Sequence, residues 1–299
     1  MPQIIDIPSS QPCSLPEAIE ALAALDFDPR EAESTNQAAL WLRRLSNNRT
    51  FLADVLLDRL AGRTAGEVES GYGPQAILLS PLRGRMFLRA NIWPAEQDLC
   101  FRNSGAESFV YGVPHDHNFS FLTSGYLGPG YASDYFEYDY ETVTGVPGED
   151  AALRFVERSA LHEGKLMLYR AHRDVHSQLP PESLSVSLNV MHVDPAQAWF
   201  DQYGFDLESG EVTRVLSPNA TEVFLCAAVA SGSDEAATFA ADIGAGHPSE
   251  RLRLASFEAR AGVVRDVAEH DELWRQGELC GSRMVASLAK EHRAKLGAR

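Results

Sequence analysis

The middle of the chain, from about residue 75 to residue 195, consists of short runs of β-branched and aromatic residues that glycine and proline separate. None of these runs has the apolar spacing of a ten-residue helix, and several have the length and composition typical of strands. Two of them, QAILLSP and RMFLRANIW, flank the turn residues 82–84 and predict a β-hairpin. We therefore expect antiparallel sheet here, in the form of a barrel or a sandwich.

Helical patterns lie on both sides of this segment. Ser14, Pro16 and Glu17 are typical of a helix-capping box with proline in the first turn, and further helices are expected near residues 34–44 and 50–62. After Pro218 the chain is rich in alanine, which predicts short stacked helices that faintly resemble HEAT-type hairpins. The predicted fold class is α+β, with an N-terminal helical region (1–70), a β-rich domain (71–212) and a C-terminal helical region (213–299).

Composition excludes several classes of function. The chain has 42 acidic and 26 Lys or Arg residues, a formal net charge of −16, which argues against a nucleic-acid-binding surface. No run approaches eighteen apolar residues and the start has no signal-peptide pattern, so we expect no membrane partner and a cytoplasmic location. The four cysteines are far apart and predict reduced thiols rather than a zinc knuckle.

Two groups of histidines carry the chemistry. His115 and His117 flank Asp116 in a strand-like run, and because side chains alternate in a strand, both imidazoles project to one face. Downstream, His172, Asp174 and His176 share one face if their segment is extended. The two imidazoles of the first group could chelate one metal ion, although an isolated H-x-H pair is also common on a solvated strand.

These motifs resemble the two metal-binding motifs of the cupin superfamily. Within it, residues 75–191 look most like the thiol dioxygenases, which have a strand ending in tryptophan (FLRANIW), then H-D-H, then a late histidine before a V-S-L strand. The resemblance implies an antiparallel cupin-type β-barrel between the two helical regions. It also implies a non-heme Fe(II) site whose ligands are His115, His117 and His176, and it leaves a homodimer open.

The chain departs from these relatives at three places. The glutamate that usually follows H-x-H is replaced by residues 119–122, FSFL, which favours a ligand set of histidines alone. The strand QAILLSP lacks the arginine that binds the substrate carboxylate in thiol dioxygenases, and Asn189 and Met191 stand where their last strand carries His and Tyr. Cysteine is therefore not the expected substrate.

Further site residues follow from the placement of polar side chains. His172 is a candidate fourth ligand, base or rim residue, and with it the candidate catalytic residues are Asp174 and Tyr135. An imidazole N–H could be accepted by Asp174, Glu137, Tyr135 or Asn189. A substrate could be bound by Arg85, Arg89, Arg173 and Tyr138, because an arginine clamps a carboxylate through two hydrogen bonds.

The sequence thus predicts a non-heme iron oxygenase that uses O2 to oxidise a small polar or amino-acid-like metabolite. Three alternatives stay open: a non-redox metal cupin acting as isomerase or lyase, a 2-oxoglutarate-dependent oxygenase built from His172, Asp174 and a third histidine on another strand, for which His192 follows closely in the sequence, and a non-catalytic binding module. The glycine-rich run SGYLGPGY predicts a hairpin turn rather than a phosphate-binding loop, since no helix follows it.

Overall fold

A computed structural model describes residues 1–9, 11–62, 73, 75–217 and 219–297. The chain divides into two compact units. The first, here called the β unit, comprises Met1–Tyr140, Asp150–Pro195 and Gly204–Glu211. The second, the helical unit, comprises Glu141–Glu149, Ala196–Tyr203 and Val212–Arg299.

A six-stranded antiparallel sheet forms most of the β unit. Its strands lie in the order β1, β7, β4, β9, β3, β2. Their bounds are β1 Gln3–Ile4, β2 Ala76–Leu78, β3 Met86–Trp93, β4 Phe121–Leu127, β7 Leu166–Tyr169 and β9 Ser185–His192. The hairpin predicted from QAILLSP and RMFLRANIW is confirmed, since β2 and β3 pair antiparallel.

A second sheet has three strands: β5 (Ala132–Glu137) lies between β6 (Arg154–Ala160) and β8 (Asp174–Gln178). Two further strands, β10 (Tyr203–Phe205) and β11 (Val212–Val215), form a small sheet of their own. The predicted mixture of helices with antiparallel sheets is confirmed. Among the described residues the strands form separate sheets, and a closed barrel is not shown.

The glycine-rich run between β4 and β5 is not the hairpin turn that the sequence predicted. The two strands belong to different sheets, so this segment leads the chain from one sheet to the other. Gly130 has φ +82°, and a Cβ there would lie 2.1 Å from the carbonyl oxygen of Leu161. Glycine is required at this position because both the backbone conformation and the close approach exclude a side chain.

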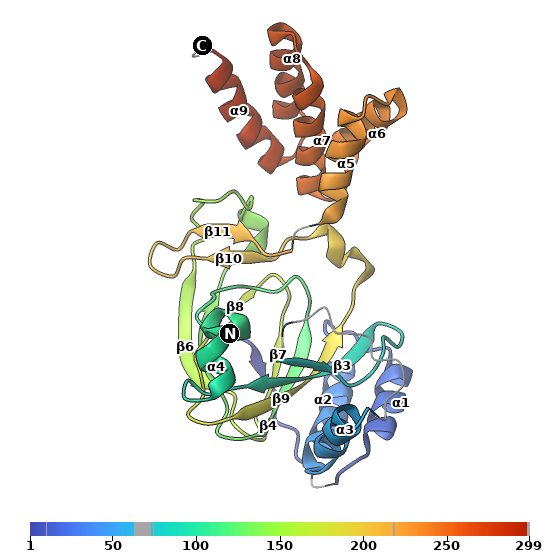
Figure 1. Cartoon of the computed structure of the whole chain (residues 1–299), viewed down its shortest axis with the longest axis vertical. Coiled ribbons are helices and arrows are strands. Elements are labelled where there is room, and N and C mark those ends of the chain that lie inside the picture. Colours follow the sequence, from blue (N-terminus) through green and yellow to red (C-terminus); the bar gives the residue numbers. More distant parts are fainter. Residues whose placement is uncertain (10, 63–72, 74, 218, 298–299) are drawn as a thin grey trace. The chain divides into compact units, whose positions relative to one another are not determined.

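Three helices cover one face of the six-stranded sheet: α1 (Leu15–Leu25), α2 (Ala32–Asn47) and α3 (Phe51–Leu60). The predicted capping box is confirmed, because Ser14 and Glu17 cap the start of α1 reciprocally. α1 contacts β3, and α2 contacts β4 and β9 (Figure 1). The shared core is largely aliphatic, and includes Leu22, Leu42, Leu45, Met86, Leu88, Ala90, Leu122, Leu188 and Val190.

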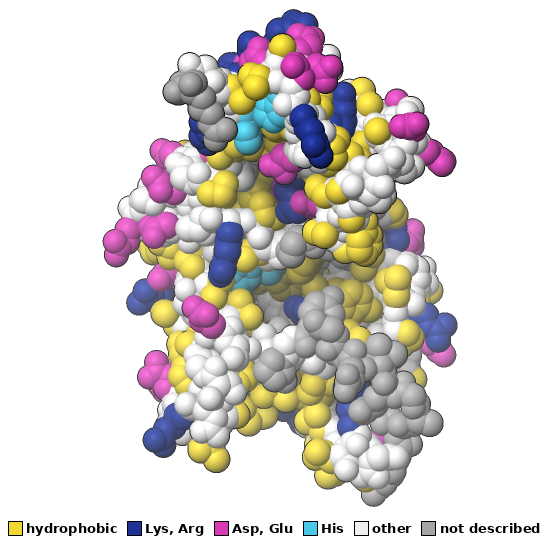
Figure 2. Space-filling view, turned by 45° about the horizontal axis from the view of Figure 1, so that its top comes forward, with side chains coloured by type: hydrophobic (Ala, Val, Ile, Leu, Met, Phe, Trp, Pro, Cys, Tyr) yellow, Lys and Arg dark blue, Asp and Glu magenta, His cyan; other side chains and the backbone are white. Residues whose placement is uncertain are grey.

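Short helices connect the strands. α4 (Leu99–Ser104) was not predicted, and single 3₁₀ turns occur at Ala106–Phe109, Tyr140–Thr142 and Pro195–Trp199. On the face of the molecule in Figure 2, the described Lys and Arg side chains lie scattered among Asp and Glu and form no continuous basic patch.

The helical unit contains the alanine-rich stretches. Its helices are α5 (Ala220–Ala230), α6 (Asp234–Gly246), α7 (Glu250–Val263), α8 (Val267–Glu278) and α9 (Arg283–Gly297). Ser233, Ser249 and Asp266 each cap a helix N-terminus through the side chain, which satisfies backbone N–H groups that have no partner within the helix. No helix in the described part of the chain is long and apolar enough to cross a membrane.

Candidate metal centre

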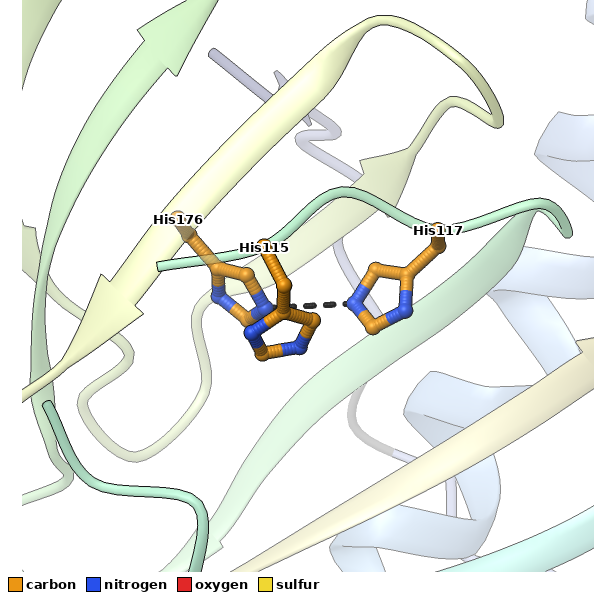
Figure 3. Close-up of side chains that lie close together, drawn as sticks. All are labelled: His115, His117 and His176. Atoms are coloured by element: carbon orange, nitrogen blue, oxygen red, sulfur yellow. Dashed lines mark hydrogen bonds between the residues drawn. The ribbon is translucent and has the colours of Figure 1, made fainter. Parts of the chain in front are cut away.

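Three histidine side chains converge in the β unit. His115, His117 and His176 each offer one ring nitrogen, and these nitrogens lie within 4.8 Å of one another. Nε2 of His117 is 3.1 Å from Nε2 of His176. Figure 3 shows the rings pointing toward one another from two segments, one of which is β8. The structure therefore brings together the three residues that the sequence predicted as metal ligands.

Backbone pairing fixes where two of these side chains start. The N–H of His115 donates to the carbonyl of His176 (3.0 Å), and the N–H of His176 donates to the carbonyl of His115 (2.9 Å). Residues that exchange both hydrogen bonds lie directly opposite each other and project to the same side. The third ligand is held differently, since the N–H of His172 donates to the carbonyl of His117 (2.8 Å).

Hydrogen bonds at Nδ1 orient two of the rings. Nδ1 of His115 is 2.7 Å from the carbonyl oxygen of Val113, which only accepts, so Nδ1 carries the proton and Nε2 keeps its lone pair. Nδ1 of His176 lies 3.4 Å from the hydroxyl of Tyr169. Nδ1 of His117 is buried without a hydrogen-bond partner, and its ring contacts those of Phe119 and Phe121.

The environment keeps these rings neutral. Burial lowers the pKa of His115, whose exposed fraction is 4%, below the usual value for histidine. Burial also holds the pKa of His176 well below that value, with a further contribution from His115. For His117 burial is again the largest cause, and positive charge on His115, His176 and Arg89 lowers the pKa further.

The donor set fits a bound cation. A metal ligand must be an unprotonated imidazole nitrogen, and burial favours the neutral ring at all three positions. Lone pairs of neutral rings that face each other at 3.1 Å repel unless a proton or a cation lies between them. Three histidines suit Fe(II), Zn(II), Ni(II) or Cu(II).

His172 lies outside the three-histidine group. Its backbone has φ +60°, which is uncommon for a residue other than glycine, and its ring packs 4.3 Å from that of Tyr140. Burial lowers its pKa to about 4. The structure thus places His172 beside the site, where its backbone holds His117.

The other two candidate catalytic residues lie close to His176 in the second sheet, Asp174 on the same strand and Tyr135 on the neighbouring strand β5. Asp174 is fully buried, and Arg170 donates to both of its carboxylate oxygens at 3.0 and 2.6 Å. Tyr135 stands opposite His176, with the two rings 6.4 Å apart and nearly parallel. Its hydroxyl lies 3.0 Å from that of Tyr169, and burial raises the pKa of both phenols.

The histidine and aspartate of the 2-oxoglutarate alternative are not brought together with His192. His192 ends β9 on the face that the helices cover, where its ring packs 5.9 Å from Phe27. The carboxylate of Asp174 is engaged by Arg170. No group of three metal-ligating side chains containing these residues is found in the described chain.

The structure separates the three candidate substrate arginines. Arg85 pairs with Asp26 at 3.1 Å on the surface, and Arg173, which is 55% exposed, pairs with Glu137 at 3.4 Å. Arg89 stands on β3 directly opposite Asn189 of β9, and its positive charge contributes to the lowered pKa of His117. Of the three, Arg89 is the one that faces the histidines.

Tyr138, the fourth candidate for substrate binding, anchors the H-D-H segment. Its hydroxyl donates to a carboxylate oxygen of Asp116 at 2.6 Å. Asp116 is fully buried, and lies between the two histidines in the sequence. This contact fixes the backbone that presents His115 and His117.

Sequence reasoning missed Tyr169 and Phe121. The two residues pair across β7 and β4, and their rings stack at 4.5 Å with an interplanar angle of 9°. Phe121 was noted only as a residue replacing the usual glutamate. The run LMLY predicts a strand that ends at Tyr169 just before the second histidine group, but its contact with Phe121 depends on the pairing of two strands far apart in the sequence.

Comparisons with known proteins find only distant likenesses. No family matches the chain, and no curated protein is significantly similar to it. Among solved structures, salicylate 1,2-dioxygenase from Pseudaminobacter salicylatoxidans has a TM-score of 0.24 and 11% identity over 47% of this chain and 31% of its own. DMSP lyase DddQ from Ruegeria pomeroyi has a TM-score of 0.28 and 10% identity over 64% of this chain and 79% of its own. Hydroquinone 1,2-dioxygenase from Sphingomonas sp. TTNP3 has a TM-score of 0.26 and 7% identity over 42% of this chain and 70% of its own.

Proposed function

We propose that this protein is a non-heme Fe(II) oxygenase of cupin type that uses O2 to oxidise a small polar or amino-acid-like metabolite. The observation that carries the proposal is the convergence of three buried, neutral imidazoles on one point. Three protein ligands leave positions on an iron ion open, and bound Fe(II) would supply the one-electron and O2 chemistry. The two antiparallel sheets would then be the walls of a cupin-type barrel.

The protein's own residues would hold and orient the substrate. Arg89 is the arginine best placed for a substrate carboxylate, because it lies on the same side of β3 as the site and is close enough to His117 to affect its pKa. The ring of Phe121, 5.0 Å from that of His117, and the ring of Phe119, 4.9 Å away, provide an apolar wall. Such a wall limits the access of water, which strengthens the electrostatic attraction between Arg89 and an anion.

Metal analysis tests the first part of the proposal. Protein purified with Fe(II) under anaerobic conditions should contain about one iron per chain, and His115→Ala or His176→Ala should bind less than about a tenth as much, since each removes one of three ligands. His162→Ala is a matched control, because His162 is in the same unit and outside the three-histidine group. Equal metal content in all four proteins would contradict the site.

Oxygen uptake tests the second part. The iron-loaded protein is mixed with candidate amino acids and small hydroxy or keto acids, and O2 consumption is recorded alongside product formation. Turnover that consumes O2 supports an oxygenase. Turnover that is equally fast without O2 contradicts it and selects the isomerase or lyase alternative. Consistent metal binding with no turnover of any candidate, with iron or another redox metal, would count against an oxygenase.

A further inference from the structure

The hydroxyl of Tyr169 lies between a candidate metal ligand and a second phenol. It is 3.4 Å from Nδ1 of His176 and 3.0 Å from the hydroxyl of Tyr135. Tyr135 and Tyr169 are completely buried and His176 is 2% exposed, so bulk water does not compete for these hydrogen bonds. A buried tyrosine hydroxyl normally has a partner, and this one has these two and also hydrogen-bonds Tyr131.

The direction of these hydrogen bonds decides what His176 can do. A phenol has one proton, so Tyr169 can donate to only one of its neighbours. If it donates to a phenol, Tyr135 or Tyr131, it accepts from Nδ1–H of His176, and Nε2 keeps the lone pair that a metal needs. If it donates to Nδ1 instead, the proton of His176 lies on Nε2, which then points at His117 and cannot ligate a metal.

His115 faces no such choice. Its Nδ1 lies 2.7 Å from a backbone carbonyl, an acceptor only, so its tautomer is fixed by the main chain. For His176 the neighbour of Nδ1 is the hydroxyl of Tyr169, which can both donate and accept a hydrogen bond. The ring of Tyr169 is held in place by Phe121, which stacks on it, and Phe121 also contacts the ring of His117.

We propose that Tyr169 is a positioning residue that fixes the metal-binding tautomer and orientation of His176, and that Tyr135 acts through Tyr169 by accepting a hydrogen bond from its hydroxyl. The inference rests on the proposed role of His176 as a ligand. Partners of this kind around a ligating histidine typically alter metal affinity 10- to 100-fold.

The first measurement needs neither metal nor turnover. Nitrogen-15 NMR of the imidazole side chains in the metal-free protein reports which ring nitrogen of His176 carries the proton. In the unaltered protein we expect the proton on Nδ1. In Tyr135→Phe the hydroxyl of Tyr169 loses one of its two phenol acceptors and donates more often to Nδ1, so the population with the proton on Nε2 should rise, and it should rise further when Tyr131 is also replaced by Phe. Tyr169→Phe should give a mixture of both tautomers.

The second measurement is metal affinity, with Co(II) titrated against a competing chelator. Tyr169→Phe should weaken binding by about 10- to 100-fold, Tyr135→Phe by a smaller factor, and the Co(II) absorption spectrum should change in both. Tyr126→Phe is the matched control: this buried hydroxyl donates to the carbonyl of Asn48, away from the histidines, so affinity should not change.

The outcomes distinguish the two proposals. An unaltered protein that binds no metal contradicts the proposed function, while the NMR measurement still decides which tautomer Tyr169 imposes. Metal binding with the same tautomer and affinity in Tyr135→Phe and Tyr169→Phe overturns the positioning role. If Tyr169→Phe does not fold, Tyr135→Phe decides alone, because it keeps Tyr169 in place and removes only one of its phenol acceptors.

Discussion

The two faces of the six-stranded sheet are built from the same strands and differ sharply in chemistry. On the helix face, Met86, Leu88 and Ala90 of β3 join a largely aliphatic core with α1 and α2. On the opposite face, here called the site face, the neighbouring residues along β3 are Phe87, Arg89, Asn91 and Trp93. Because side chains alternate along a strand, one residue step separates a packing position from a position that faces the candidate metal centre.

The site face places polar side chains beside a buried cluster that is largely aromatic and includes Trp93, Phe121 and Tyr169. Arg89, Asn189 and Thr123 stand side by side on β3, β9 and β4. Thr123 Oγ1 and Asn91 Oδ1 are buried without a hydrogen-bond partner, and leaving such an atom unpaired costs roughly 1–3 kcal/mol. We therefore expect substitutions on the helix face to change mainly the stability of the protein. Substitutions of the polar residues on the site face should change mainly binding.

The largest effect should come from the helix face. Leu88→Ala removes a fully buried side chain from the core against α1 and α2, and should lower the free energy of unfolding by about 3 kcal/mol. Metal affinity measured below the unfolding temperature should change less than about twofold. Chemical denaturation and Co(II) titration check the two values. A loss of Co(II) affinity well above twofold would contradict the division between the faces.

Arg89→Met tests the neighbouring residue on the site face. The methionine keeps an apolar side chain of similar length and removes the charge, so the free energy of unfolding should change by less than about 1 kcal/mol. The KM for an anionic substrate should rise about 10- to 100-fold, because one charge-assisted hydrogen bond is lost. Steady-state kinetics with an uncharged analogue provides the comparison. An equal loss with both substrates would contradict a carboxylate-binding role.

Tyr138→Phe sharpens the comparison at the segment that carries two histidines. Losing the hydroxyl that donates to buried Asp116 should destabilise the β unit by about 1.5 kcal/mol and weaken Co(II) binding several-fold, because the H-D-H backbone loses an anchor. Tyr126→Phe again serves as the control for loss of a buried hydroxyl. Weaker substrate binding with unchanged metal affinity would instead indicate the direct contact predicted from the sequence.

The smallest effect concerns pH. Burial lowers the pKa of His172 to about 4, so the unfolded chain takes up a proton near its usual pKa of about 6.5 while the folded protein does not. The contribution of the neutral His172 ring to the free energy of unfolding is therefore fully present above about pH 6.5 and is lost as pH falls toward about 4. Between pH 7 and pH 5.5 the free energy of unfolding should fall by about 1 kcal/mol for this reason.

His172→Asn isolates that contribution in the metal-free protein. Asparagine tolerates the left-handed backbone and does not titrate, so the fall in melting temperature between pH 7 and pH 5.5 should be smaller in the variant. Thermal unfolding by circular dichroism checks this. An identical pH dependence in both proteins would show that the other buried histidines account for it.

Local patterns predicted much of the β unit. RMFLRANIW was recognised as a strand because it is rich in branched and aromatic residues, and the start of α1 was recognised because Ser14 and Glu17 cap each other within one turn. The run containing Gly128 and Gly130 was misread as a hairpin. Glycine indicates a left-handed backbone, but it does not indicate which strands the turn connects.

The candidate site was predictable only in part. The sequence predicted that His115 and His117 share a side because side chains alternate in a strand, but in the structure only His115 is β-bridged and residues 116–117 lie in no strand. Their approach to His176 depends on pairing across a long stretch of chain, and only the resemblance to cupins suggested it. Tyr169 was missed for the same reason. Its place behind His176 depends on its register with Phe121, which neither residue's neighbours reveal.

The reciprocal backbone pairing of His115 with His176 has a consequence for synthesis of the chain. The two residues become neighbours only when the strand ending at Gln178 exists, so a ribosome must extend the polypeptide past that point before a complete binding pocket for an ion can assemble.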